Sequence, residues 1–222
     1  MTKRWKNRPE GSTWGDFGED DEKGRLNLLT PEKVRQGAAE VQTGENFCLS
    51  LPLDYPGTRL LNPRRFPPRH FTTQRGGLAN FNYPMSIHNP NLVDVICDDS
   101  VLLCLQYSTQ WDSLCHVGAQ FDADGDGEAE IVYYNGYRAN EHIVGPDENN
   151  PGDESLQFEG SQARRLGIEN AAETCLQGRG VMIDIEKHFG RERTYIDYDA
   201  LMRVIDADDV TVETGDMVLL HT

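Results

Sequence analysis

The segment QYSTQWDSLCH, residues 106–116, contains four polar side chains that could do chemistry together. Gln106 and Gln110 are four residues apart, and so are Asp112 and His116. Residues at this spacing share one face of a helix, so a turn after the apolar run VLLCL could direct them to one cavity. A carboxylate with amide oxygens suits a divalent metal, and a histidine can transfer protons near neutral pH. The same residues also fit a buried hydrogen-bond network in which they satisfy one another.

The segment FDADGDGEAEI, residues 121–131, offers a second cation site. Asp122, Asp124 and Asp126 match the opening of an EF-hand loop, in which carboxylates at alternate positions surround calcium. The closing glutamate of such a loop is replaced here by Tyr133, and no amphipathic helix flanks the segment. The sequence therefore predicts an acidic turn in which Asp and Gly supply positive φ, with a calcium loop as the alternative.

The composition limits the classes of function. The chain has 222 residues with 21 Lys+Arg against 37 Asp+Glu, a formal net charge of −16. Nucleic acid and anionic membranes require cationic surface, so both are disfavoured as partners and a small molecule is favoured. There is no long apolar run and no apolar core in the N-terminal region, which predicts neither a membrane span nor a secretory signal. Five scattered cysteines without a CxxC motif indicate reduced thiols and a cytoplasmic protein.

Local signals predict the elements that must position these residues. Helices are expected over 31–42 after the cap Thr30, over 169–177 before Gly178, and over 198–206 after the cap Asp197. Strands are expected over 47–53, 92–97, 101–106, 129–134, 181–186 and 212–220, with 92–97 and 101–106 forming a hairpin. Residues 1–24 read as an irregular arm, and residues 54–91 and 146–159 as long loops. This order predicts a single mixed α/β domain, residues 1–222, with a central sheet.

The block TQWDSLCHVG, residues 109–118, resembles the signature of the putative cyclase family, which includes kynurenine formamidase and isatin hydrolase. The family's pattern His-x-Gly-Thr-His-x-Asp-x-Pro-x-His falls on Gln106, Ser108, Thr109, Gln110, Asp112, Leu114 and His116. Further blocks resemble longer members of the family, namely GRLNLLTPEKV at 24–34, FCLSLPL at 47–53, FDADGDGEAEIVYYNGYR at 121–138, RGVMIDI at 179–185 and GDMVLL at 215–220. The resemblance therefore covers nearly the whole chain.

The resemblance implies a metal-dependent hydrolase. Gln106, Gln110 and Asp112 would hold manganese or zinc, and His116 would be the proton shuttle in attack of water on an amide or related carbonyl. Two family histidines are glutamines here, and an amide oxygen is a poorer ligand for zinc than imidazole, though tolerable for manganese. We therefore expect an arylformamidase-like enzyme of tryptophan/kynurenine catabolism with a weakly bound metal or none. The alternative is a non-catalytic member that binds a small molecule or serves as a structural subunit.

The resemblance also implies a fold, an assembly and substrate contacts. The family adopts a swivelling β/β/α arrangement and usually forms dimers or tetramers. Trp111 would contact the substrate, as would Trp14 and Phe17 from the N-terminal arm. Members with two metals take further ligands from a region after the GDxVLL strand, whereas this chain stops at LLHT. We therefore expect the C-terminal portion of the family domain to be absent from this chain, as in a truncated product.

Overall fold

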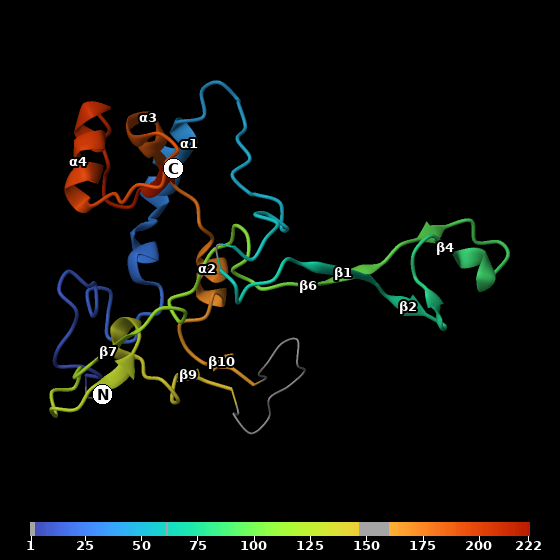
Figure 1. The fold of residues 1–222 in the computed structure, drawn as a ribbon, viewed down its shortest axis with the longest axis horizontal. Helices are drawn as coiled ribbons and strands as arrows, with labels where there is room; N and C mark the ends of the chain where they lie inside the picture. The colour runs from blue at the N-terminus through green and yellow to red at the C-terminus, as the bar shows by residue number, and fades with distance from the viewer. Residues whose placement is uncertain (1–2, 61, 147–159) are drawn as a thin grey trace. The chain divides into compact units, whose positions relative to one another are not determined.

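The computed structural model describes residues 3–60, 62–146 and 160–222 (Figure 1). Backbone contacts divide the chain into unit 1, residues 1–45 and 113–222, and unit 2, residues 46–112. In the described ranges the strands pair only in twos, which gives six two-stranded sheets instead of one large central sheet. The fold is therefore mixed α/β, as predicted, with its strands distributed among short ladders. No helix in these ranges has the length and hydropathy needed to cross a bilayer.

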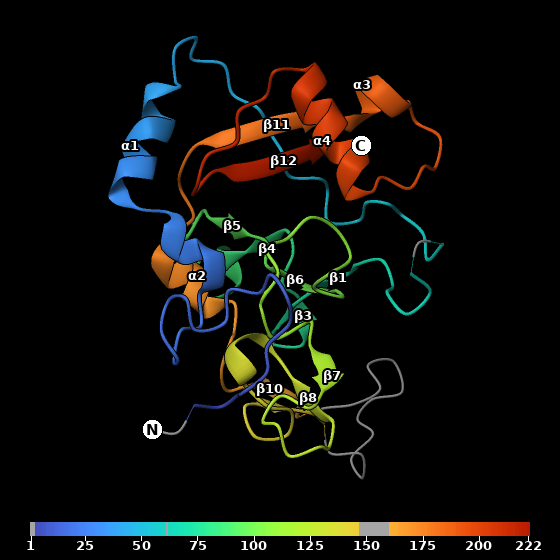
Figure 2. The ribbon, with the colours of Figure 1, turned by 90° about the vertical axis from the view of Figure 1, so that its left-hand side faces the viewer.

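The C-terminal part of unit 1 is built on two parallel strands. β11 (Gly180–Asp184) pairs with β12 (Met217–His221), and α3 (Ile185–Phe189) and α4 (Tyr198–Ala207) lie in the connection between them (Figure 2). Parallel strands need a long crossover, which these helices supply. Ile183, Ile185 and Val204 form the buried core of this region. Both predicted strands and the predicted helix are confirmed, although β12 begins five residues later than 212.

The side chain of Asp197 caps the N-terminus of α4, as the sequence predicts. The carboxylate of Asp197 accepts a hydrogen bond from the backbone N–H of Ala200 at 2.8 Å. We expect Asp197→Ala to lower the free energy of unfolding by about 1 kcal/mol, because that N–H loses its partner. Asp199→Ala, in the first turn of the same helix, leaves the cap intact and serves as the control. Urea unfolding of both variants measures the difference, and equal losses would contradict the capping role.

The N-terminal arm packs into unit 1 through aromatic residues. β7 (Ala119–Phe121) and β8 (Glu130–Val132) form an antiparallel pair, and the core beside them contains Trp5, Trp14, Ala123 and Val132. The Trp5 and Trp14 rings meet edge to face with centroids 5.7 Å apart. The arm has few regular elements, as predicted, and its tryptophans are core residues. It leads into a 3-10 helix, η1 (Gly24–Leu28).

The remaining elements of unit 1 are short, apart from α1. α1 (Pro31–Ala39) begins at the predicted cap, where Thr30 Oγ1 accepts from the N–H of Lys33 at 3.4 Å, and it ends three residues before the expected Gln42. The helix predicted over 169–177 is α2 (Glu169–Thr174). The other elements are η3 (Tyr134–Gly136) and the antiparallel pair β9 (Ile143–Val144) and β10 (Gln162–Ala163). The acidic loop expected over 146–159 lies outside the described residues except for Pro146.

An ion-pair cluster joins α1 to the start of β12. The buried carboxylate of Asp216 contacts Lys33 Nζ at 2.9 Å and Arg179 Nη1 at 3.0 Å, and it accepts from the N–H of Glu213 at 2.7 Å. Burial by itself would raise the pKa of Asp216. The N–H of Glu213 and the two cations outweigh it, so the pKa lies below its ordinary value of 3.8.

The lowered pKa of Asp216 predicts how the stability of the protein depends on pH in acid. A carboxylate whose pKa is lower in the folded protein stabilises it above the unfolded pKa, and this contribution is lost as the pH falls through the folded value. We therefore expect Asp216→Asn to be less stable than wild type above pH 3.8, with the difference shrinking at more acid pH. Urea unfolding across this range measures the difference, with Asp206→Asn on α4 as the control. A difference that does not change with pH would contradict the assignment.

Unit 2 differs most from the sequence-based prediction. The expected strand 47–53 is not formed, and the expected loop 54–91 contains strands. β1 (Arg69–Thr72) pairs with β6 (Asp99–Leu102), and β4 (Tyr83–Pro84) pairs with β5 (Val95–Ile96), so the predicted hairpin of 92–97 with 101–106 is wrong. β2 (Gln74–Arg75) and β3 (Leu78–Ala79) form a small hairpin, and η2 (Met85–Ile87) follows β4. β1 and β4 of the Pro-rich segment therefore pair with β6 and β5, the two strands that the hairpin prediction had paired with each other.

Candidate active site

The segment 106–112 is held in unit 2 by its own polar side chains. Tyr107 Oη donates to the carbonyl of Thr58 at 3.0 Å, and Ser108 Oγ donates to the carbonyl of Pro52 at 2.6 Å. Thr109 Oγ1 accepts from the N–H of Leu51 at 3.0 Å. The backbone of 51–58 belongs to no strand, so these side chains satisfy groups that a ladder would otherwise pair. The Tyr-Ser-Thr run is therefore the scaffold that fixes the glutamines and the aspartate on either side of it.

Two of the predicted site residues meet directly. Gln106 Nε2 donates to Asp112 Oδ2 at 3.0 Å. Arg65 Nη2 donates to Gln106 Oε1 at 3.3 Å, and Arg65 Nη1 donates to the backbone carbonyl of Gln106. The amide of Gln106 thus links a guanidinium to a carboxylate and fixes which way that carboxylate points. Arg65 was missed by the sequence reasoning, because nothing in the spacing of the Pro-rich segment distinguishes it from its neighbours.

A cavity of about 400 Å³ lies within unit 2, and its lining includes the two residues that precede Asp112 in the chain. Leu49, Ser50, Thr109, Gln110 and Trp111 line it. Trp111 is 63% exposed and Leu49 is 62% exposed, so an indole and an aliphatic side chain are both available for contact. Small-molecule sites combine such apolar surface with a few polar groups that fix orientation. Here the polar groups are the amide of Gln110 and the hydroxyls of Ser50 and Thr109.

The predicted metal ligands fit a divalent cation only in part. A carboxylate and two amide oxygens are chemically suited to a hard cation. Gln106, however, directs its amide oxygen to the guanidinium of Arg65 and its amide nitrogen to Asp112. A cationic neighbour at the ligand oxygen opposes metal binding there. The full set Gln106, Gln110 and Asp112 therefore does not fit a metal in this arrangement, and Gln106 acts as a positioning residue for Asp112.

The remaining predicted site residues belong to unit 1. His116 lies in a turn, where its N–H donates to the carbonyl of Ser113 at 3.2 Å, and its proton-shuttle role stays a prediction. Trp14 is 6% exposed and packs against Trp5, while Phe17 is half-buried in a turn of the arm. Their substrate contacts also stay predictions, and the structure gives Trp14 a packing role in the core.

The acidic loop is organised by backbone hydrogen bonds. Asp122 accepts from the N–H groups of Gly125, Asp126 and Gly127 at 2.6, 3.1 and 3.0 Å. Gly125 and Gly127 have φ of 75° and 96°, values that favour glycine. This is the geometry of the acidic turn that the sequence predicts. Calcium binding by the loop stays untested.

Three carboxylates of this loop lie close enough to share a cation. Ligand oxygens of Asp122, Asp124 and Glu130 are all within 4.8 Å of one another. Arg138 contacts two of them, with Nη2 at 2.9 Å from Asp124 Oδ2 and Nη1 at 2.9 Å from Glu130 Oε1. The group could hold a metal ion, and Arg138 already supplies a positive charge there.

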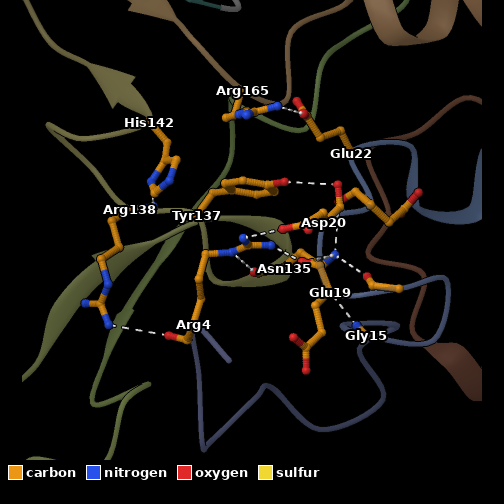
Figure 3. A network of polar contacts seen from close by, with 12 residues as sticks. Arg4, Gly15, Glu19, Asp20, Glu22, Asn135, Tyr137, Arg138, His142 and Arg165 are labelled. Atoms are coloured by element: carbon orange, nitrogen blue, oxygen red, sulfur yellow. Dashed lines mark hydrogen bonds and ion pairs between the residues drawn. The ribbon is translucent and has the colours of Figure 1, made fainter. Parts of the chain in front are cut away.

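Figure 3 shows a network of polar contacts around Asn135. Its side chain is fully buried: Oδ1 accepts from the N–H of Gly15 at 2.7 Å, and Nδ2 lies 2.9 Å from the carbonyl of Gly18 and 3.0 Å from that of Asp21. Arg4 Nε donates to the backbone carbonyl of Asn135 at 3.1 Å. Asn135 thereby fastens the N-terminal arm to the segment YYNGYR. Its Asn-Gly sequence could have indicated the turn, but not the partners.

Two tyrosines extend this network. Tyr137 Oη donates to the carbonyl of Asp20 at 3.1 Å, and Tyr134 Oη donates to Asp21 Oδ2 at 2.8 Å. Burial raises the pKa of Tyr134, and the hydrogen bond to the Asp21 carboxylate raises it further. The phenol therefore stays a neutral donor over the physiological range. The role of this network is structural, because its hydrogen bonds attach the N-terminal arm to residues 134–137.

Comparison with known proteins identifies the family of this chain. Residues 47–222 match the family described as "Putative cyclase", so the chain belongs to this family. A crystal structure described as that of a novel cyclase is 27% identical, with a TM-score of 0.66. The alignment covers 94% of this chain and 60% of that chain, so this chain spans about three fifths of the length of its structural relative. No match was found among curated proteins.

Proposed function

We propose that this protein hydrolyses an amide, cyclic amide or ester bond of a small aromatic molecule, with chemistry of the arylformamidase type. Membership of the cyclase family supports hydrolase chemistry. The observation that carries the proposal is the cavity of unit 2 lined by Gln110 and Trp111, the two residues that precede Asp112, which itself accepts a hydrogen bond from Gln106. Five free cysteines favour a reducing compartment, and we place the activity in the cytoplasm.

The residues of the cavity suggest how a formamide would bind. The indole of Trp111 and the side chain of Leu49 would contact an aromatic ring, a contact that contributes about 1 kcal/mol beyond area burial for paired rings. The amide N–H of Gln110 would donate to the carbonyl oxygen of the scissile bond. Ser50 lies in the same lining and would supply a further hydroxyl. These contacts orient the carbonyl carbon for attack.

The chemical step requires a base and an acid. The family resemblance, and not the placement of the two units, gives the proton-shuttle role to His116: it would take a proton from the attacking water as the new carbon–oxygen bond forms and return it to the leaving nitrogen as the carbon–nitrogen bond breaks. Asp112, held by Gln106, orients the reacting water. The family resemblance implies a divalent metal, manganese or zinc. No step is assigned to it, because the amide oxygen of Gln106 is engaged by Arg65.

A second candidate function rests on that same contact. Arg65 donates to the amide oxygen of Gln106, and Gln106 in turn donates to Asp112, so the contact that opposes a metal at Gln106 favours a non-catalytic member that binds a small molecule. Arg65→Met separates the two hypotheses, because it removes the guanidinium that donates to the amide oxygen of Gln106. If the protein is a metal-dependent hydrolase, this variant should bind manganese at least as tightly as wild type and keep its turnover. If the relay only holds a binding site, the variant should gain neither metal nor activity.

The experiment is an initial-rate assay with formanilide, run without metal and with manganese or zinc. Binding of formanilide is followed in parallel by isothermal titration calorimetry, with Trp111→Leu as the reference for the cavity. Hydrolysis that Trp111→Leu weakens supports the enzyme. Saturable binding that Trp111→Leu weakens, without hydrolysis under any metal condition, would overturn the enzyme in favour of the binding protein.

A further inference from the structure

Positive charge in this acidic chain is concentrated in one part of unit 2. Residues 55–93 contain five arginines and no lysine, aspartate or glutamate, so their formal net charge is +5. The whole chain has 21 Lys+Arg and 37 Asp+Glu, so the other residues contain 16 and 37 of these and have a formal net charge of −21. A basic segment without acidic residues creates a local positive potential, and this potential favours an anionic ligand.

Two of these arginines lie over the same aromatic ring. The guanidinium carbon Cζ of Arg59 is 5.9 Å from the centroid of the Phe66 ring, and that of Arg69 is 5.4 Å from it. Because both distances end at one centroid, the two guanidiniums are no more than about 11 Å apart. A cation over a ring is attracted by the negative charge of its π system. The half-buried ring of Phe66 therefore holds two positive charges close together.

The hydrogen-bond donors of both guanidiniums are available to a ligand. A guanidinium is planar, and its N–H groups point outward in that plane, so a guanidinium held over a ring still presents donors at its outer edge. Arg59 and Arg69 are exposed, and within the described ranges no hydrogen bond or ion pair engages their side chains. Arg65, in contrast, donates to Gln106. The two guanidiniums over Phe66 thus combine a fixed position with unused donors.

We propose that Arg59 and Arg69, held over Phe66, bind a small molecule that carries two anionic groups. Each guanidinium can donate two parallel N–H···O bonds to one carboxylate or phosphoryl group, a strong and geometrically specific contact. A molecule with two such groups would engage both guanidiniums at once, and its second contact would form without a further loss of translational freedom. Carboxylate and phosphoryl groups share this chemistry. The proposal does not depend on the proposed hydrolase activity.

Isothermal titration calorimetry of the full chain in metal-free buffer tests the proposal. The probes are pyrophosphate and succinate, which have two acidic groups each, and acetate, which has a single one. We expect pyrophosphate, succinate or both to bind more tightly than acetate, with an affinity that falls as sodium chloride is added, because salt screens exposed charges. Binding of pyrophosphate alone would assign the site to phosphorylated ligands, and binding of succinate alone would assign it to dicarboxylates.

Substitutions distinguish these two guanidiniums from positive charge in general. Arg59→Met and Arg69→Met should each weaken binding about tenfold, because each removes one bidentate contact. Arg75→Met is the matched control: it removes an exposed arginine that lies over Tyr83 in the same unit, and it should leave the affinity unchanged. Phe66→Leu changes no charge and should also weaken binding, because both guanidiniums lose the ring that holds them.

Four results would overturn the proposal. Neither pyrophosphate nor succinate binds to the wild type, or acetate binds as tightly as they do. Arg59→Met and Arg69→Met both keep the wild-type affinity, or Arg75→Met weakens binding as much as they do. The last result would mean that the anions respond to the charge of residues 55–93 as a whole and not to a site at Phe66.

Discussion

Replacing Asn135 with alanine is expected to lower the free energy of unfolding by about 3 kcal/mol or more. The side chain is fully buried, and its loss leaves the N–H of Gly15 and the carbonyls of Gly18 and Asp21 without their partner. Each buried group that loses its hydrogen bond costs about 1–3 kcal/mol. The residue also has φ of 59°, a conformation that asparagine and glycine tolerate and alanine does not favour, at a cost of about 1 kcal/mol. Urea unfolding measures the total.

Two further variants separate the causes. Asn135→Gly keeps the backbone conformation and removes only the side-chain hydrogen bonds, so it should recover only the part due to φ. Asn135→Asp keeps an acceptor for the N–H of Gly15 but presents a carboxylate to the carbonyls of Gly18 and Asp21, so it should be strongly destabilised. Limited proteolysis should then cut the N-terminal arm first. If Asn135→Gly is as stable as wild type, the network does not fasten the arm.

Asp112→Ala is expected to lower kcat/KM for formanilide by about 100-fold, the effect of misplacing a reacting group, because Asp112 orients the attacking water in this proposal. Asp112 is exposed, so the same change should alter the free energy of unfolding by less than about 0.5 kcal/mol. Asp54→Ala removes another exposed carboxylate of unit 2 and is the matched control. An Asp112→Ala protein that retains wild-type turnover would remove Asp112 from the mechanism.

The effect on binding distinguishes catalysis from simple ligand recognition. If Asp112 acts on the reacting water, Asp112→Ala should keep its affinity for formanilide while it loses turnover. If Asp112 contacts the ligand itself, affinity and turnover should fall together. Fluorescence quenching of Trp111 reports the affinity in both proteins, because this indole lines the cavity.

Helices of this chain were predictable from local signals. Thr30 and Asp197 each cap a helix through a side chain that bonds to an N–H three residues later, so the information lies within one turn of the chain. The strands of unit 2 were not predictable in the same way. β6 pairs with β1 across an intervening segment of more than twenty residues that contains other short strands, and such pairing depends on tertiary contacts that an apolar pattern does not encode.

The sequence predicted that residues of the segment 106–116 lie close together, but it did not predict the geometry of their contacts. The spacing of the segment 106–116 suggested that Gln106 and Asp112 converge, and they do meet, through an irregular loop and not through a helix face. The orientation of the Gln106 amide depends on Arg65, which is 41 residues away in the sequence. The role of Asn135 was not predicted because its partners are backbone groups of the arm. Every residue carries such groups, so the sequence does not show which of them Asn135 contacts.

The central claim is that this chain turns over a small aromatic amide. The most direct test is the initial rate of formanilide hydrolysis by the wild-type protein, supplied in turn with no metal, manganese and zinc. Our account predicts formate and aniline released in equal amounts, with repeated turnover per chain in at least one of these conditions. If a folded protein that binds formanilide at Trp111 releases neither product in any of them, the hydrolase is contradicted and the chain is a binding protein of the cyclase family.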